Sequence, residues 1–120
     1  MNNRENISFE EQYSRLKRLH CDMKLDIPMH SNFNVYTKFI DSIKRVKQYT
    51  YDVLGSLIKE NQSIDFSKIS IDAIQHIASQ NDVTFTKLTR DTHKNELTYM
   101  LTMWTDDTSD FNCYLIFTVC

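Results

Sequence analysis

The sequence predicts an α+β domain: two or three N-terminal helices packed on one face of a C-terminal three-stranded antiparallel β-meander. Two observations predict it. Residues 82–120 are rich in Thr, Val, Tyr, Phe and Ile and alternate between apolar and polar side chains, which is typical of half-buried strands. Residues 8–80 instead place apolar side chains at helical spacing.

Three strands are expected, at residues 83–88, 96–104 and 111–119, joined by polar turns at 90–94 and 105–109. Because side chains alternate between the two faces of a strand, one face collects nearly all the apolar residues. The members of this apolar face are Val83, Phe85, Leu97, Tyr99, Leu101, Met103, Phe111, Cys113, Leu115, Phe117 and Val119.

The turn lengths predict the register of this meander. They pair Phe85 with Tyr99, and they also give the pairs Met103 with Phe111 and Leu101 with Cys113. A slip of one residue would turn the whole apolar face toward water, so the pattern itself favours this register.

The opposite face is mostly threonine, but four large side chains interrupt it: Met100, Trp104, Tyr114 and Ile116. Aromatic and methionine side chains are enriched at protein interfaces, so this group is a candidate partner-binding patch. The alternative is that a helix or the N-terminus covers it. The last strand also has no Pro or Lys to blunt its open edge, so we expect a helix or another chain to lie against that edge.

A first helix is expected to begin at Ser8, which forms a capping box with Glu11, and to end near Leu25 ahead of Pro28. Its buried stripe comprises Phe9, Tyr13, Leu16, Leu19 and Met23. A third, short helix is expected from Ser67 or Ser70 to Gln80, and Asn81-Asp82 would then end it.

The second helix is expected from Ser31 or Asn34 to Glu60 and has the most regular pattern in the chain. Its apolar stripe comprises Tyr36, Phe39, Ile43, Val46, Thr50, Val53 and Leu57, widened by Ile40 and Leu54. A helix of this length overhangs a small sheet, so its free end needs the first helix or another subunit as a partner. Gly55 weakens the last turn and is a candidate early end.

Composition predicts one soluble domain spanning residues 1–120, with residues 1–7 disordered. The 120 residues are 41% hydrophobic and 25% charged, and the net charge is −2. No run of about twenty apolar residues and no signal peptide is found, so we expect no membrane span. The three cysteines are expected to be reduced thiols of a cytoplasmic or nuclear protein.

No catalytic or metal-binding motif is found in the sequence. His20, Cys21 and His30 lack the paired spacing of zinc ligands, and His76 and His93 have no nucleophile at a suggestive distance. The acidic cluster at 106–110 lacks a calcium loop's glycine and ligand series. We therefore expect no metal, no cofactor and no enzymatic activity, while a site assembled across two subunits is left as an alternative.

A second alternative is association with nucleic acid. The second helix carries the densest basic run of the chain, with Lys38, Lys44, Arg45 and Lys47 as the candidate phosphate-contacting residues. Residues 61–120 are acidic on balance, however, which argues against base stacking on a basic sheet.

The order of elements over Ser31–Val119, helices followed by an antiparallel meander, resembles RWD-type domains. That resemblance implies a docking or dimerisation module within a larger assembly. The chain departs from the RWD pattern because the helices that normally follow the sheet are missing, so the resemblance assigns no residues.

These observations together predict a non-enzymatic protein–protein interaction module, such as an adaptor, an inhibitor or an assembly subunit. It would bind another protein or a second copy of itself. The binding surface would be the exposed edge or face of the sheet, or the long second helix.

Overall fold

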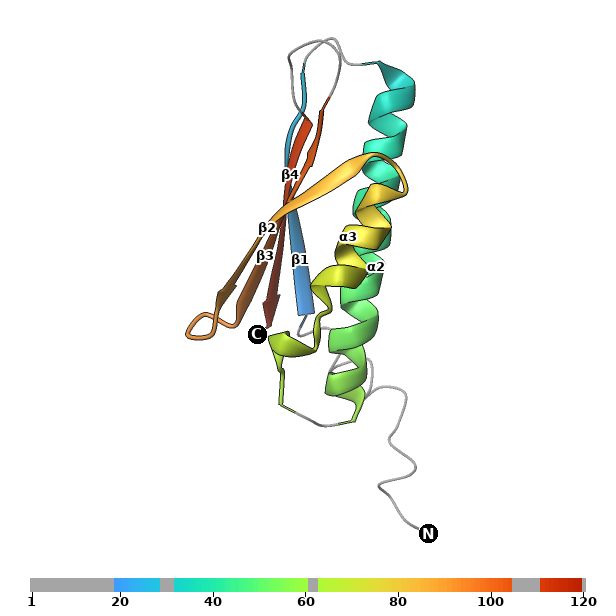
Figure 1. The fold of residues 1–120 in the computed structure, drawn as a ribbon. Helices are drawn as coiled ribbons and strands as arrows, with labels where there is room; N and C mark the ends of the chain where they lie inside the picture. Colours follow the sequence, from blue (N-terminus) through green and yellow to red (C-terminus); the bar gives the residue numbers. More distant parts are fainter. Residues whose placement is uncertain (1–18, 29–31, 61–62, 105–110, 120) are drawn as a thin grey trace.

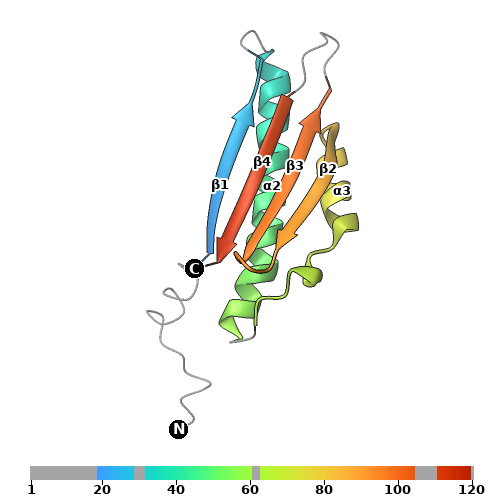
Figure 2. The same ribbon diagram turned by 90° about the vertical axis from the view of Figure 1, so that its left-hand side faces the viewer.

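The computed structural model describes residues 19–28, 32–60, 63–104 and 111–119. Its elements, in chain order, are β1 (Leu19–Asp26), α2 (Phe33–Lys59), the 3-10 helix η1 (Phe66–Lys68), α3 (Ile71–Ser79), β2 (Val83–Asp91), β3 (Glu96–Met103) and β4 (Phe111–Val119). The strands form one antiparallel sheet in the order β1-β4-β3-β2. Both α-helices lie on the same side of this sheet (Figures 1 and 2).

The α+β class is confirmed, but the described residues form a sheet of four strands rather than three. Residues 19–26, which were expected to be helical, form β1 instead. Leu19, Cys21, Met23 and Leu25 alternate with polar residues, and this period of two suits a strand. The remainder of the expected first helix, from Ser8 to residue 18, lies outside the described residues.

Strand β1 also corrects the prediction of an open edge at β4. The two strands pair along their whole length, from Leu19 opposite Val119 to Asp26 opposite Asn112. β4 is therefore an inner strand, and the edge that was expected to attract a helix or another chain is filled by β1. The outer strands of the sheet are β1 and β2. Since a strand precedes α2, the element order that suggested an RWD-type domain is only partly present.

The β3–β4 register is confirmed, with Met103 opposite Phe111 and Leu101 opposite Cys113. The β2–β3 register is wrong at Phe85, which pairs with Leu101 rather than with Tyr99, because the pairing continues to Asp91 opposite Glu96 and the turn lies at 92–95 rather than at 90–94. A β-bulge between Phe85 and Lys87 inserts one extra residue.

The bulge reverses the alternation of side chains along β2. Leu88 consequently lies opposite Tyr99, on the helix side of the sheet, where it is half-buried. The rings of Phe85 and Tyr99 still meet edge to face, with their centroids 6.0 Å apart.

Helix α2 begins after Asn32, whose side-chain oxygen accepts a hydrogen bond from the backbone N–H of Asn34 at 2.8 Å. Gly55 is buried and does not end the helix, which continues to Lys59. The expected stripe is largely buried, with Phe39, Ile43, Val46, Thr50, Leu54 and Leu57 at its centre.

The C-terminal end of α2 is covered within the chain, whereas Phe33 and Tyr36 at its N-terminal end are 78% and 37% exposed. Leu57 and Ile58 near its C-terminus belong to the same buried cluster as Phe66 and Ile69 of the following connector. This end of α2 therefore needs no second subunit to cover its apolar residues.

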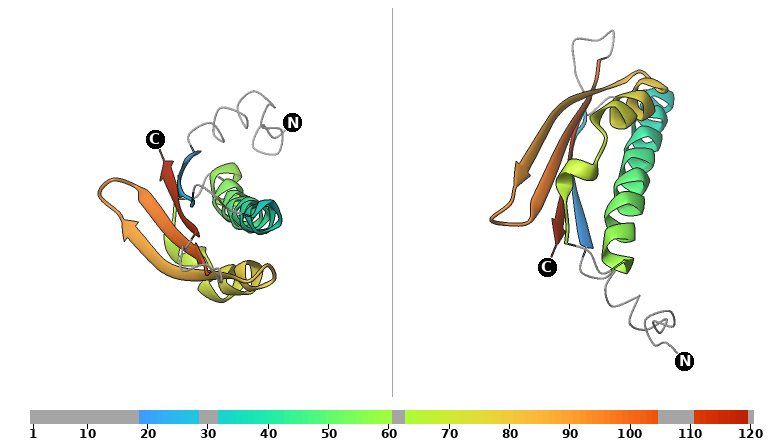
Figure 3. Two further views of the ribbon diagram at one scale, coloured as in Figure 1. Left: turned by 90° about the horizontal axis from the view of Figure 1, so that it is seen from above. Right: turned by 60° about the horizontal axis from the view of Figure 1, so that its bottom comes forward.

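Helix α3 begins at the expected cap, because the Ser70 hydroxyl oxygen accepts a hydrogen bond from the N–H of Ala73 at 3.2 Å. It packs beside α2, where the hydroxyl of Ser42 donates to the carbonyl of Ala78 at 3.4 Å. The view from above shows the two helices side by side against the twisted sheet (Figure 3). The buried residues of the helices and the strands form one hydrophobic cluster.

Within the part of the chain that the structure describes, no helix is both long and apolar enough to cross a membrane.

Candidate binding surface

The sheet face turned away from α2 and α3 carries no described helix (Figure 2). We call it the open face. Its centre is a cross-strand row in which Met100 of β3 lies opposite Tyr114 of β4. Lys24 of β1 and Lys87 of β2 stand at the two ends of the same row. Opposed side chains in such a row have Cβ atoms about 5 Å apart, so Met100 and Tyr114 are neighbours.

Ile116 extends this apolar centre into the next row. It lies two residues from Tyr114 on the same face of β4, between Asp22 of β1 and Thr98 of β3. Tyr114 is 41% exposed, while Met100 and Ile116 are half-buried. Three of the four predicted patch residues are thus contiguous. We call Met100, Tyr114 and Ile116 the open-face cluster.

Trp104, the fourth predicted residue, stands apart from this cluster. It follows the last residue of β3 and is 68% exposed. The row of Thr102 and Asn112 separates it from Met100 and Tyr114, and the Thr102 hydroxyl donates to Asn112 Oδ1 at 3.0 Å. Trp104 is therefore a separate exposed aromatic at the end of the sheet.

The predicted basic residues do not form one row on α2. On the side toward α3, Arg45 Nε lies 3.1 Å from Asp41 Oδ2, and Lys38 Nζ lies 4.0 Å from Asp82 Oδ2. On the side toward β1, Lys47 Nζ lies 5.9 Å from the centroid of the Tyr51 ring. Lys44 is exposed. Carboxylates partner two of these four cations, and the other two do not extend the same row.

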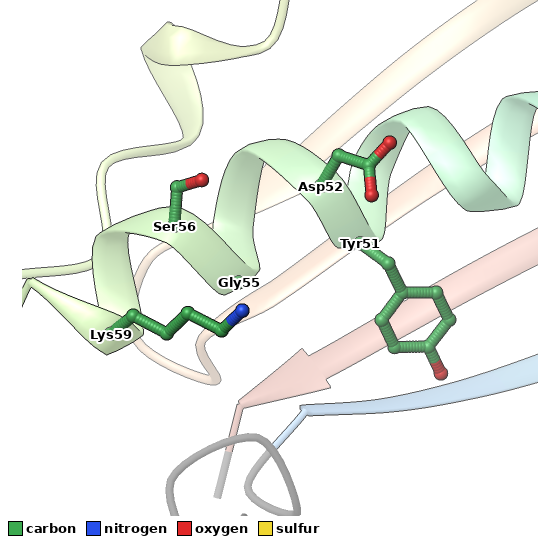
Figure 4. A pocket seen from close by; sticks show the side chains of 5 residues that line it. All are labelled: Tyr51, Asp52, Gly55, Ser56 and Lys59. Carbon is green, nitrogen blue, oxygen red and sulfur yellow. The ribbon is translucent and has the colours of Figure 1, made fainter. Parts of the chain in front are cut away.

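A hollow of about 500 Å³ lies along the C-terminal half of α2, lined by Tyr51, Asp52, Gly55, Ser56 and Lys59. In Figure 4 the Asp52 carboxylate and the Ser56 hydroxyl point away from the Tyr51 ring, and the Lys59 side chain runs toward Gly55. Asp52 also accepts a hydrogen bond from Gln48 Nε2 at 2.8 Å. These groups do not converge on one point, so the hollow lacks the geometry of a nucleophile with its base.

The two described cysteines are poor nucleophiles. Burial raises the pKa of the Cys113 thiol to about 12. Burial also raises the pKa of Cys21, although the nearby Lys47 opposes this effect. The thiolate is the reactive form of cysteine, so neither residue is activated as a nucleophile. Among the described residues, no three His, Cys, Asp or Glu side chains gather as a metal site would require.

The sequence interpretation missed the contribution of β1 to the open face. His20, Asp22, Lys24 and Asp26 point to this side, because their partners in β4 are Thr118, Ile116, Tyr114 and Asn112. The strict alternation of apolar and polar residues over 19–26 was the available signal, but helical spacing of Leu19 and Met23 concealed it.

Comparison with known proteins returns no similarity: no protein-family model matches the sequence, and neither a curated protein nor a solved structure does.

Proposed function

We propose that this chain is a non-enzymatic protein-binding module that holds its partner on the open face of the sheet. The observation that carries the proposal is the open-face cluster, in which an exposed tyrosine lies against a methionine and an isoleucine on a face without a described helix. Tyrosine and methionine are enriched in interfaces, and tyrosine is a frequent hot-spot residue.

The surroundings of the cluster fit an interface rim. Lys24, Asp22 and Lys87 stand beside it on the two outer strands, so charged residues of both signs border an apolar centre. Such a border contributes more to selectivity and encounter rate than to affinity. The cluster also lies on the two inner strands of the sheet, which are paired with a neighbour on each side, so ordering it on binding should cost little conformational entropy.

Affinity capture with the immobilised full chain tests this function. Wild type is compared with Tyr114→Ala and Met100→Ala, and Thr89→Ala on β2 serves as the control because Thr89 is exposed on the same face, outside the cluster. Captured proteins are quantified by mass spectrometry, and a thermal melt verifies that each variant is folded.

We expect at least one protein to be retained by wild type and by Thr89→Ala but lost from both cluster variants. Trp104→Ala is expected to retain it, since Trp104 lies apart from the cluster. If folded Tyr114→Ala and Met100→Ala retain the same proteins in the same amounts as wild type, the open face is not the binding surface.

A further inference from the structure

The two edges of the sheet differ in their fitness to accept another strand. β2 carries the bulge between Phe85 and Lys87, and a bulge twists an edge away from regular pairing. β1 is regular, because all eight of its residues pair with β4 without a shift in register. The geometry of β1 is therefore the better suited to strand addition.

The helix side of β1 is incompletely covered. Leu19 is only 5% exposed, but Met23 is 48% exposed and Leu25 is 39% exposed. Their partners in β4, Leu115 and Cys113, are fully buried. A strand added beside β1 would cover these two apolar side chains in the way that β1 covers those of β4.

We propose that β1 pairs with β1 of a second copy of this chain, antiparallel and in a register centred on Met23. The two four-stranded sheets then become one continuous sheet of eight strands. This inference uses the β1 edge rather than the open-face cluster, shares with that surface only the border residues Asp22 and Lys24, and does not depend on that proposed function.

On the open face, the order of charges along β1 supports this register. In a two-fold symmetric antiparallel pair centred on Met23, Asp22 lies opposite Lys24 of the second copy. His20 lies opposite Asp26 of the second copy in the same register. Symmetry repeats both pairs, so each carboxylate of the strand lies opposite a lysine or a histidine, whose N–H groups can donate a hydrogen bond to it.

The helix side of the same register is apolar throughout. Met23 meets its own symmetry copy on the axis, and Cys21 lies opposite Leu25 of the second copy. Leu19 lies opposite Ile27, the half-buried residue that follows the strand. The register therefore places apolar side chains opposite one another on the helix side, and on the open face it places Asp22 opposite Lys24 and Asp26 opposite His20.

Neighbouring registers fail this test. A register centred on Asp22 places two copies of Asp22 against each other. A register centred on Lys24 opposes two lysines and also places Asp22 against Asp26. A register shifted by one residue would place the helix side of one copy level with the open face of the other. Apolar side chains would then lie opposite polar ones. Charges on an edge strand usually discourage association, but of the registers centred on Asp22, Met23 and Lys24, only the one centred on Met23 avoids placing like charges opposite each other.

In this dimer the two-fold axis stands perpendicular to the sheet, so both copies of α2 and α3 lie on one side. The two open faces form a single surface on the other side. A dimer of this kind would present two open-face clusters in one plane.

Molar mass in solution, measured by size-exclusion chromatography with light scattering under reducing conditions over a wide concentration range, tests the dimer. We expect a dimer for wild type and a dissociation constant raised by about tenfold or more in Lys24→Asp, because two attractive pairs become repulsive. The double variant Asp22→Lys/Lys24→Asp restores opposite charges and should restore the dimer. Lys87→Asp, the matched substitution on β2, should leave it unchanged.

A disulfide cross-link tests the dimer independently if the charge variants fold poorly. Met23→Cys places two thiols opposite each other on the axis, so oxidation with diamide should give a disulfide-linked dimer beyond the wild-type background. Thr89→Cys on β2 should not. A monomer at every concentration without this cross-link, or a dimer that persists unchanged in Lys24→Asp, would overturn the proposal. Tyr114→Ala should leave the dimer intact, which separates this inference from the open-face function.

Discussion

The hydroxyl oxygen of Tyr99 on β3 lies 2.7 Å from Oγ1 of Thr50 on α2, and both residues are fully buried. Thr50 has one hydroxyl hydrogen, which it donates to the carbonyl of Val46 at 3.0 Å. Tyr99 is therefore the donor to Thr50. This chain of two hydrogen bonds joins the sheet to the helix through an otherwise apolar layer and explains why a threonine occupies the stripe of α2.

Thr50→Val should destabilise the fold more than Tyr99→Phe. The valine leaves the buried Tyr99 hydroxyl without an acceptor, which costs about 1–3 kcal/mol. The phenylalanine removes the donor, but Thr50 keeps its bond to Val46, so we expect a loss of about 0.5–1.5 kcal/mol. Urea denaturation of both variants measures the difference in free energy of unfolding.

The double variant Thr50→Val/Tyr99→Phe provides the control for this pair. Because it leaves no unpaired hydroxyl, its cost should be smaller than the sum of the two single costs. Additive losses, or a larger loss for Tyr99→Phe than for Thr50→Val, would contradict the assignment of Tyr99 as donor.

Stability should fall at alkaline pH because of Cys113. Burial raises the pKa of this thiol from 9.0 to about 12, so the folded state favours the neutral form. The stabilisation is fully present below pH 9.0 and is lost as pH rises toward about 12, by about 1.4 kcal/mol per pH unit. Cys113→Val should show a shallower decline in chemical denaturation between these limits.

Tyr99 provides a control, because its effect on stability begins at a higher pH than that of Cys113. Burial raises its pKa above the ordinary value of 10.0, so Tyr99→Phe should change the pH dependence only above about that pH. Cys21 adds a contribution in the same direction as Cys113, since burial also raises its pKa. An identical decline for wild type and Cys113→Val between pH 9 and 10 would contradict the assignment.

Elements with a strong local signal could be predicted from the sequence. The long apolar stripe and the polar residues before it located α2 within a few residues of its observed ends. The alternation over 96–103 and 111–119 gave β3, β4 and their register. The Met100–Tyr114 pair of the open face follows from that register.

The missed features depend on contacts distant in sequence. Residues 19–26 satisfy both a helical and a strand pattern, and their pairing with β4, far along the chain, decides between them. The bulge in β2 changes which face of the sheet Leu88 occupies, and no turn-forming residue marks the position of the bulge in the sequence. In contrast, the separation of Trp104 from the cluster was already contained in the predicted register, which places the Thr102–Asn112 row between Trp104 and Met100.

The turn between β2 and β3 should be sensitive to substitution at Asn95. This residue has a φ of 51°, in the left-handed region that asparagine and glycine tolerate best. Asn95→Val should cost about 1–2 kcal/mol, because a β-branched side chain clashes there. Asn95→Gly should be neutral or slightly stabilising. Thermal denaturation measures both, and equal effects of valine and glycine would contradict the backbone argument.

Single-stranded nucleic acid should bind weakly at most. Arg45 and Lys38 are partnered by Asp41 and Asp82, and Lys47 lies on a different side of α2, so phosphates meet no continuous basic row. We expect no saturation of a fluorescently labelled oligonucleotide at near-physiological salt, measured by anisotropy. Asp41→Asn, which removes one carboxylate beside Arg45, should leave this result unchanged. Tight binding that weakens steeply with added salt, and that Lys44→Glu abolishes, would instead establish α2 as a nucleic-acid surface.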